Sequence, residues 1–312
     1  MNLAEAVDRA RAGNKHAIAR LVGVFEDTRA TGPAQRAQVL ELLAMAPVGA
    51  VVGLTGTPGA GKSSLLARVV PALLAGDRQL RVAVLAIDPA SHVSGGALLG
   101  DRTRTRFGGE ERAYFRSQSN ATELGGLAPT TFQVTRLLQR LFDLVIVETV
   151  GIGQSELDVR HLADHVYLVL QPLGGDEIQF LKAGIVEVPD SFVLNKCDDP
   201  AANVSYYQLR SALSLARPFE DLPPVMRTSA RTGEGIEELS AHLLGVAGGP
   251  RRHTDAARAR YFFERWVDDE WGAVGRRFAG TVPDLLAQAD GFDGAQARFG
   301  VQIIDWLGAR SG

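Results

Sequence analysis

The sequence predicts an α/β protein with a doubly wound, mostly parallel sheet and additional helices at both ends of the chain. Two observations predict this class. Between residues 48 and 248, short runs rich in β-branched residues alternate with helix-like segments, and the runs are apolar throughout, which is typical of strands covered on both faces. Before and after this region, apolar residues recur at helical spacing without a strand pattern. We therefore expect a helical extension over 1–47, the α/β domain over 48–248 and a helical arm over 249–312.

The residues before position 48 predict two or three helices. The sequences AIARLVGVFED and AQRAQVLELLAM carry apolar residues at helical spacing, and the turn residues Thr31, Gly32 and Pro33 separate them. The expected strands then follow in chain order as VVGLTG, RVAVLAID, FDLVIVET, HVYLVLQ, SFVLNK and PPVMRTSA.

The break before the C-terminal arm is marked by Gly248, Gly249 and Pro250. A helix is expected beyond it, and it carries the large side chains Tyr261, Phe262, Arg265, Trp266 and Trp271. These side chains either pack on the parent domain or form a subunit interface, where aromatic residues and arginine are favoured. The sequences VPDLLAQAD and GAQARFGVQIIDWL predict two further short helices.

Composition limits the classes of partner. The chain has 312 residues, 46% of them hydrophobic, and a net charge of -3, which provides no basic surface for nucleic acid or an anionic membrane. No apolar run approaches the ~20 residues of a membrane-spanning helix, and the first residues lack the apolar core of a signal peptide. A soluble, cytoplasmic protein is expected. Cys197 is the only cysteine, so neither an internal disulfide nor a cysteine-based metal cage is expected.

A phosphate-binding loop is predicted directly after the first strand. The sequence GTPGAGKS follows the run AVVGLT and precedes the helix-like SSLLARVVPALL. Backbone N–H groups of such a loop converge on phosphates, and Gly59 and Gly61 permit the close approach. Lys62 is expected to reach the β and γ phosphates and Ser63 to bind magnesium. The expected nucleotide contacts here are Gly56, Thr57, Pro58, Gly59, Ala60, Gly61, Lys62, Ser63 and Ser64.

Acidic residues at strand ends are candidates for the metal side of the nucleotide. Glu148 ends FDLVIVE, where a Walker-type strand delivers its carboxylate, and Gly151 and Gly153 follow in a segment that suits a γ-phosphate sensor. Asp88 and Asp101 are further candidates for the metal shell. An ordinary helix cap or turn residue is the alternative for each of these two.

A guanine-binding site is predicted at the end of a later strand. Asn195, Lys196 and Asp198 in NKCD match the signature of guanine-binding P-loop proteins. The Asp198 carboxylate accepts two hydrogen bonds from the N1–H and N2–H groups of guanine, whereas adenine lacks this donor pair. Asn195 is expected to join the base-binding loops and Lys196 to cover the face of the base. After the next strand come Thr228, Ser229 and Ala230, of which Ser229 and Ala230 are expected to contact the nucleotide.

Several of these segments together resemble the MeaB/ArgK GTPases, chaperones of adenosylcobalamin-dependent acyl-CoA mutases. The resembling pieces are GLTGTPGAGKSSLL, AIDPASHVSGGALLGDRTR, LGGLAPTT, FDLVIVETVGIGQSE, GGDEIQFLKAGIVEVPD and LNKCDD, which cover most of residues 50–200. The resemblance implies a G domain of the signal-recognition and MinD-like (SIMIBI) class, with an N-terminal helical piece and a C-terminal arm that forms a homodimer. The sequence departs from the family pattern at His92 and in FGGEERAYFRSQSNATE.

The resemblance also implies roles for individual residues. Ser63, Asp88, Asp101 and Glu148 surround Mg²⁺, and Lys62, Glu148 and Asp101 carry catalysis. The segment Gly174–Lys182 matches a loop that reports the nucleotide state to the mutase, although a capped surface helix is the alternative. The resemblance assigns no water-orienting residue; by its position in ETVGIGQSE, Gln154 is available for this role, and a polar surface role is the alternative.

The resulting hypothesis is a magnesium-dependent GTPase, with GTP and GDP as ligands, that gates cofactor loading, protection or reactivation of an adenosylcobalamin-dependent acyl-CoA mutase. Three rivals stay open at this point. One is an ATP-dependent kinase linked to amino-acid transport, which conflicts with the Asp198 argument. Another is a nickel-type metallochaperone GTPase, which needs a cluster of histidines or cysteines. The third is a nucleotide-dependent scaffold that does not hydrolyse its ligand.

Overall fold

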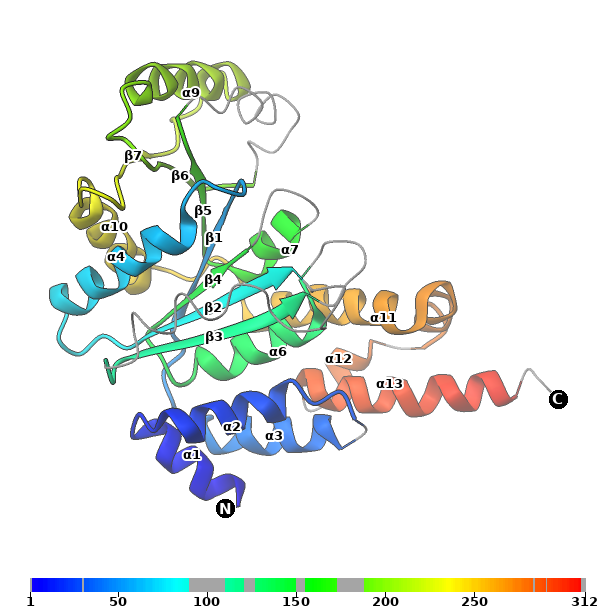
Figure 1. Ribbon diagram of the computed structural model, residues 1–312. Coiled ribbons are helices and arrows are strands. Elements are labelled where there is room, and N and C mark those ends of the chain that lie inside the picture. Colours follow the sequence, from blue (N-terminus) through cyan, green and yellow to red (C-terminus); the bar gives the residue numbers. More distant parts are fainter. Residues whose placement is uncertain are drawn as a thin grey trace. The chain divides into compact units, whose positions relative to one another are not determined.

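A computed structural model describes residues 2–29, 31–89, 110–120, 127–149, 155–172, 188–282, 284–289 and 291–309. The chain divides into two compact units (Figure 1). Unit 1 comprises Met1–Pro47, Pro129–Leu141 and His253–Gly312, and unit 2 comprises Val48–Ala128 and Phe142–Arg252. The division of the chain at residues 47 and 248 stays a prediction.

Unit 2 is built on a seven-stranded sheet in the order β3-β2-β4-β1-β5-β6-β7, and every described strand pairing is parallel. The strands are β1 (Ala50–Gly56), β2 (Val82–Pro89), β3 (Ala113–Asn120), β4 (Leu144–Glu148), β5 (His165–Leu170), β6 (Ser191–Leu194) and β7 (Val225–Arg227). The predicted parallel α/β class is confirmed. Because all the strands run in one direction, the ends of β1, β4 and β6 meet at one edge of the sheet.

The sequence analysis missed strand β3. Its sequence, AYFRSQSN, mixes polar and apolar residues, and the strand lies at the edge of the sheet with β2 as its single strand neighbour. An edge strand need not be apolar throughout, since part of it faces water. The expected run of hydrophobic residues is therefore absent from β3.

Helices cover both faces of this sheet. One face packs on α4 (Lys62–Gly76) and α10 (Ile236–Gly248), where Leu73 and Leu243 join Val52 and Ile146 of the strands in one buried cluster. The other face packs on α9 (Ala202–Ala216) and on α7 (Ser155–Leu162), which contacts β1 and β5. A Cβ on Gly53 would lie 2.2 Å from Val159 of α7, so this strand position has no room for a side chain.

Unit 1 consists of helices taken from three parts of the chain. They are α1 (Leu3–Arg11), α2 (Lys15–Phe25), α3 (Gly32–Leu42), α6 (Pro129–Leu138), α11 (Asp255–Ala279), α12 (Leu285–Gln288) and α13 (Gly291–Gly308). Asn2 and Asn14 cap the first two helices by accepting hydrogen bonds from backbone N–H groups. The helix predicted after Pro250 is present, and it is kinked at Gly272, where φ is +55°.

Aromatic side chains form the centre of unit 1. The rings of Phe132 and Phe262 stack with centroids 4.6 Å apart, and Phe299 lies edge-on to Phe263 at 5.8 Å. A buried ion-pair network lies in the same unit, where Asp293 of α13 accepts from Arg36 of α3 at 2.7 Å and from Arg136 of α6 at 2.8 Å. These contacts join helices that are far apart in the sequence.

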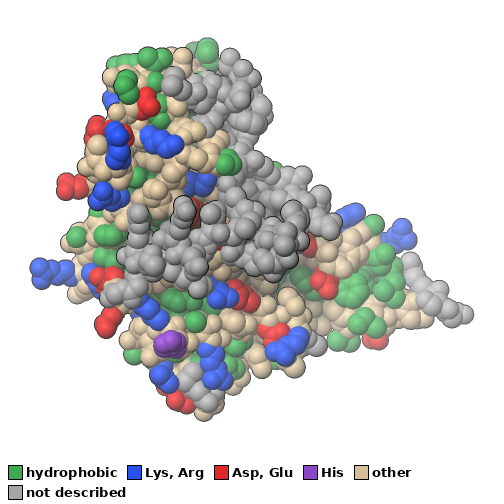
Figure 2. Space-filling model, in the orientation of Figure 1, with side chains coloured by type: hydrophobic (Ala, Val, Ile, Leu, Met, Phe, Trp, Pro, Cys, Tyr) green, Lys and Arg blue, Asp and Glu red, His purple; other side chains and the backbone are tan. Residues whose placement is uncertain are grey.

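Charged side chains of both signs are interspersed over the described residues of the face drawn in Figure 2. Within the described ranges, none of the helices is long and apolar enough to span a bilayer. An apolar stripe is nevertheless exposed on α13, where Val301, Ile304 and Leu307 are 63%, 60% and 37% accessible.

Candidate functional site

The predicted phosphate loop connects the end of β1 to the start of α4. Gly56 has φ of +148°, and a Cβ there would lie 2.1 Å from the carbonyl oxygen of Val169 in β5. Gly61 caps α4 with φ of +87°, and its Cβ would lie 2.7 Å from Nδ2 of Asn195. Both positions require glycine, one because a neighbouring strand is close and the other because a side chain of the predicted base site is close.

Lys62 lies inside the loop rather than on its surface. Its side chain is 7% exposed, and Nζ donates to the carbonyl oxygens of Gly56 at 2.6 Å and Thr57 at 3.1 Å. The ammonium group is thus held among backbone dipoles at the positive end of α4. A phosphate in the loop would meet both the helix N-terminus and this cation.

The predicted metal ligands Ser63 and Glu148 are in direct contact. The Ser63 hydroxyl donates to Oε1 of Glu148 at 2.7 Å, which brings the loop and the end of β4 together. Burial raises the pKa of Glu148, the Ser63 hydrogen bond and the Lys62 charge oppose this rise, and the charge of Asp88 adds to it. Asp88, at the end of β2, accepts from Ser117 of β3 at 2.5 Å, and burial also raises its pKa.

This set of oxygens fits a hard divalent cation. Two buried carboxyl groups and a hydroxyl are the ligand types that Mg²⁺ prefers, and a cation would offset the cost of charging Glu148 and Asp88 in a buried site. Among the described residues there is no group of three or more His, Cys, Asp or Glu side chains arranged to hold a metal. Asp101, the fourth predicted ligand, lies outside the described residues.

Asn195 joins the phosphate loop to the predicted base site. It is 1% exposed, its Nδ2 donates to the carbonyl of Ala60 at 2.8 Å, and its Oδ1 accepts from Thr228 Oγ1 and from the N–H of Ala230, each at 3.3 Å. One side chain therefore connects the ends of β1, β6 and β7. The three predicted nucleotide motifs are brought together in space, although 135 residues separate Ala60 from Asn195.

Asp198 lies between two donors. Ser229 Oγ donates to Oδ1 at 2.5 Å, and the Arg231 guanidinium forms an ion pair with Oδ2. The hydrogen bond from Ser229 is the main cause that lowers the pKa of Asp198, and the charge of Arg231 contributes to it. The carboxylate is therefore ionised at neutral pH, which is the form that accepts hydrogen bonds from a guanine edge.

Three contacts at this site were not predicted. Lys196 has φ of +58°, and its Nζ donates to Gln171 at the end of β5 at 2.6 Å. Arg68 of α4 donates to the carbonyl of Ala230 at 3.0 Å, and Arg231 contacts Asp198. Gln171 is the last residue of the predicted run HVYLVLQ, and Arg231 directly follows the predicted contact Ala230, so their positions were a usable signal. Arg68 lies within a helix, where the sequence contains no such signal.

One further predicted nucleotide contact, Ser64, lies exposed in the first turn of α4. The following predicted residues lie outside the described residues: His92, Asp101, Gly151, Gly153, Gln154 and Gly174–Lys182.

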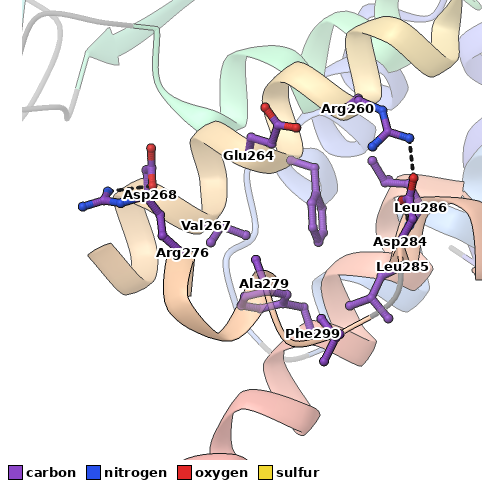
Figure 3. A pocket seen from close by; sticks show the side chains of 12 residues that line it. Arg260, Glu264, Val267, Asp268, Arg276, Ala279, Asp284, Leu285, Leu286 and Phe299 are labelled. Atoms are coloured by element: carbon purple, nitrogen blue, oxygen red, sulfur yellow. Dashed lines mark hydrogen bonds and ion pairs between the residues drawn. The ribbon is translucent and has the colours of Figure 1, made fainter. Parts of the chain in front are cut away.

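A pocket of about 510 Å³ lies in unit 1, and none of its lining residues is a predicted nucleotide contact (Figure 3). Its lining includes the apolar side chains Phe263, Val267 and Phe299. The rim carries the ion pairs Arg260–Asp284 and Arg276–Asp268. Each of these four charged side chains is paired with one of opposite charge. We assign the pocket no role in nucleotide chemistry.

Comparison with known proteins identifies the family. Residues 18–260 match the family described as "Methylmalonyl Co-A mutase-associated GTPase MeaB". The chain belongs to the MeaB family. This MeaB-family chain is 38% identical over 241 residues to a putative GTPase of Pyrococcus horikoshii, covering 75% of the chain and 74% of that relative. It is 37% identical over 296 residues to a putative GTPase of Caulobacter vibrioides, with 88% of each covered.

Two other similarities extend this result. The chain is 41% identical over 196 residues to the mouse protein named methylmalonic aciduria type A homolog, mitochondrial, covering 60% of the chain and 46% of the mouse protein. The crystal structure of an LAO/AO transport system kinase superposes with a TM-score of 0.62 at 26% identity, covering 93% of this chain and 89% of the other. The predicted MeaB/ArgK resemblance and P-loop fold are confirmed, and this MeaB-family chain is a GTPase.

Proposed function

We propose that this GTPase hydrolyses GTP to GDP and phosphate with magnesium, and that it uses this change to gate cofactor loading, protection or reactivation of an adenosylcobalamin-dependent acyl-CoA mutase. The observation that carries the nucleotide part is the Asn195 bridge, which joins the phosphate loop to Ala230 in the loop after β7. Ser229 of that loop in turn donates to the ionised Asp198. The mutase part rests on the family match, whose description names methylmalonyl-CoA mutase.

In this proposal the chain acts mainly by position and charge. Lys62 exchanges its two backbone carbonyl partners for phosphate oxygens and offsets the charge that develops on the transferred phosphoryl group. Ser63, Glu148 and Asp88 would hold Mg²⁺, together with Asp101, and the ion would offset charge on the phosphates. The Ser63 hydroxyl and the Glu148 carboxylate, which are hydrogen-bonded to each other, would both be ligands.

A change of base preference tests the guanine site. In Asp198→Asn, the side-chain amide offers one acceptor and one donor instead of two acceptors, which matches the N1–H and C2 carbonyl of xanthine. We expect GDP affinity to fall by at least tenfold and XDP affinity to rise. Asp199→Asn is the matched control, because it removes the same charge from the neighbouring exposed residue. If Asp198→Asn keeps the wild-type preference for GDP, the base-site assignment is wrong.

The partner is tested by capture with the full chain. The protein is loaded with a non-hydrolysable GTP analogue or with GDP, and captured proteins are identified. The proposal is supported if a cobalamin-dependent mutase is recovered in an amount that differs between the two nucleotides. Equal recovery with a Lys62→Ala variant that cannot bind nucleotide contradicts the gating role.

We also propose that the C-terminal helices form a homodimer. The stripe Val301, Ile304 and Leu307 on α13 supports this, because contiguous exposed apolar residues favour association. Light scattering is expected to give twice the mass of 33.4 kDa for the wild type and the monomer mass for Ile304→Glu. A monomeric wild type contradicts this part of the proposal.

Two rival functions make different predictions. An ATP-dependent kinase would turn over ATP and GTP equally, and the similarity to a protein named as a transport kinase is the observation that keeps this test necessary. A nickel metallochaperone would bind nickel tightly without nucleotide. Steady-state turnover of both nucleotides and nickel titration by calorimetry separate these rivals from the proposed function.

A further inference from the structure

Both oxygens of the Asp198 carboxylate are already engaged by side chains of the following loop. Ser229 Oγ donates to Oδ1 at 2.5 Å, and the Arg231 guanidinium contacts Oδ2. The two partners differ in exposure: the Ser229 hydrogen bond is partly buried, whereas the Arg231 side chain is 78% exposed. Ser229 thus orients the carboxylate from the protein side, and Arg231 approaches it from the solvent side.

The backbone that carries Arg231 is held independently of this ion pair. Arg68 of α4 donates to the carbonyl oxygens of Ala230 at 3.0 Å and Arg231 at 3.3 Å. The N–H of Thr232 donates to Ser229 Oγ at 3.0 Å. Arg231 can therefore leave Asp198 by rotating its side chain while the loop stays in place.

A guanine base presents its donors to the same carboxylate. Its N1–H and N2–H groups would donate to the two oxygens of Asp198, and Arg231 already contacts Oδ2 with a charge-assisted interaction. We propose that Arg231 competes with the guanine base for Asp198 and so weakens the binding of every guanine nucleotide to this protein. This inference rests on the proposed guanine site and adds a residue that sets its affinity.

The effect is expected to be modest, because the ion pair is exposed to solvent. Removing the competitor should tighten binding by about 1.4- to 5-fold. GDP and GTP should tighten by the same factor, since they share the base. Affinity for ADP should not change, because adenine does not offer the donor pair that meets Asp198.

The test measures equilibrium affinity for GDP, GTP and ADP by calorimetry in the full chain. The variants are Arg231→Ala and Arg231→Gln, with Arg78→Ala as the matched control, because Arg78 is an exposed arginine in the turn after α4. We expect both Arg231 variants to bind GDP and GTP more tightly by one common factor and the control to match the wild type. Unchanged or weaker guanine-nucleotide binding in both Arg231 variants overturns the inference.

The Asp198→Asn background separates this inference from the proposed base site. A neutral amide does not attract Arg231, so adding Arg231→Ala to Asp198→Asn should leave XDP affinity unchanged. A further gain of XDP affinity in the double variant overturns competition for the carboxylate. If Asp198→Asn itself keeps the wild-type guanine preference, the proposed base site fails, whereas failure of the Arg231 variants alone leaves that site intact.

Discussion

Replacing Asp293 with asparagine should destabilise unit 1 strongly. Asp293 is 2% exposed and accepts from Arg36 through Oδ1 and from Arg136 through Oδ2. The Arg36 side chain is 5% exposed and the Arg136 side chain 17%, so little water can replace the lost charge. Asparagine keeps the size of the side chain, removes its charge and replaces one acceptor oxygen with a donor, so one of the two arginines also loses its hydrogen bond.

The expected magnitude follows from this burial. Removing one partner of a buried ion pair costs about 3–5 kcal/mol, because the remaining cation is left uncompensated. The exposed pair of Asp268 and Arg276 in the same unit provides the comparison, with side chains 43% and 60% accessible. Asp268→Asn should therefore cost only about 0.2–1 kcal/mol.

The assay uses the native tryptophans. All three, Trp266, Trp271 and Trp306, lie in unit 1, so their fluorescence in urea follows this unit. With an m-value of about 1–3 kcal/mol/M, the midpoint for Asp293→Asn should fall by about 1–5 M, and that for Asp268→Asn by only about 0.1–1 M. The reasoning is refuted if the two variants have the same midpoint.

Three further outcomes are expected. Gly61→Ala should weaken GDP binding by at least about tenfold, as measured by calorimetry. Alanine at this left-handed φ costs about 1–2 kcal/mol, and its Cβ would displace the Asn195 side chain. Wild-type affinity would contradict this expectation. Burial raises the pKa of Cys197 to about 11, so at pH 8 its reaction with a thiol reagent should be about 100-fold slower than after unfolding, and equal rates would be the contrary result. Burial lowers the pKa of His165 to about 4, so the unfolded state binds more protons between pH 6.5 and 4, and stability falls as the pH drops through this window. Over that interval, the free energy of unfolding of His165→Asn should fall by about 1–2 kcal/mol less than that of the wild type, a figure reduced for solvent screening. Urea unfolding at several pH values measures this difference, and identical pH profiles would contradict it.

The sequence predicted those parts of the site in which the chemistry is contained in a short continuous segment. The phosphate loop and the NKCD segment each combine a strand end, a turn and functional side chains within a few residues, so their local pattern identifies them. The apolar runs predicted a parallel sheet because burial on both faces leaves a visible composition. Strand β3 was missed because an edge strand is under no such constraint.

Only the tertiary structure decided how these segments meet. The Asn195 to Ala60 hydrogen bond crosses 135 positions of the chain, and the Arg36 to Asp293 pair crosses 257. No local pattern encodes such a pair, because each side chain taken alone is compatible with solvent, a cap or a partner elsewhere. The sequence by itself determined which groups are available to bind a guanine nucleotide, and the packing of the sheet and its loops decided their neighbours, since hydrogen bonds and ion pairs depend on distance in space and not along the chain.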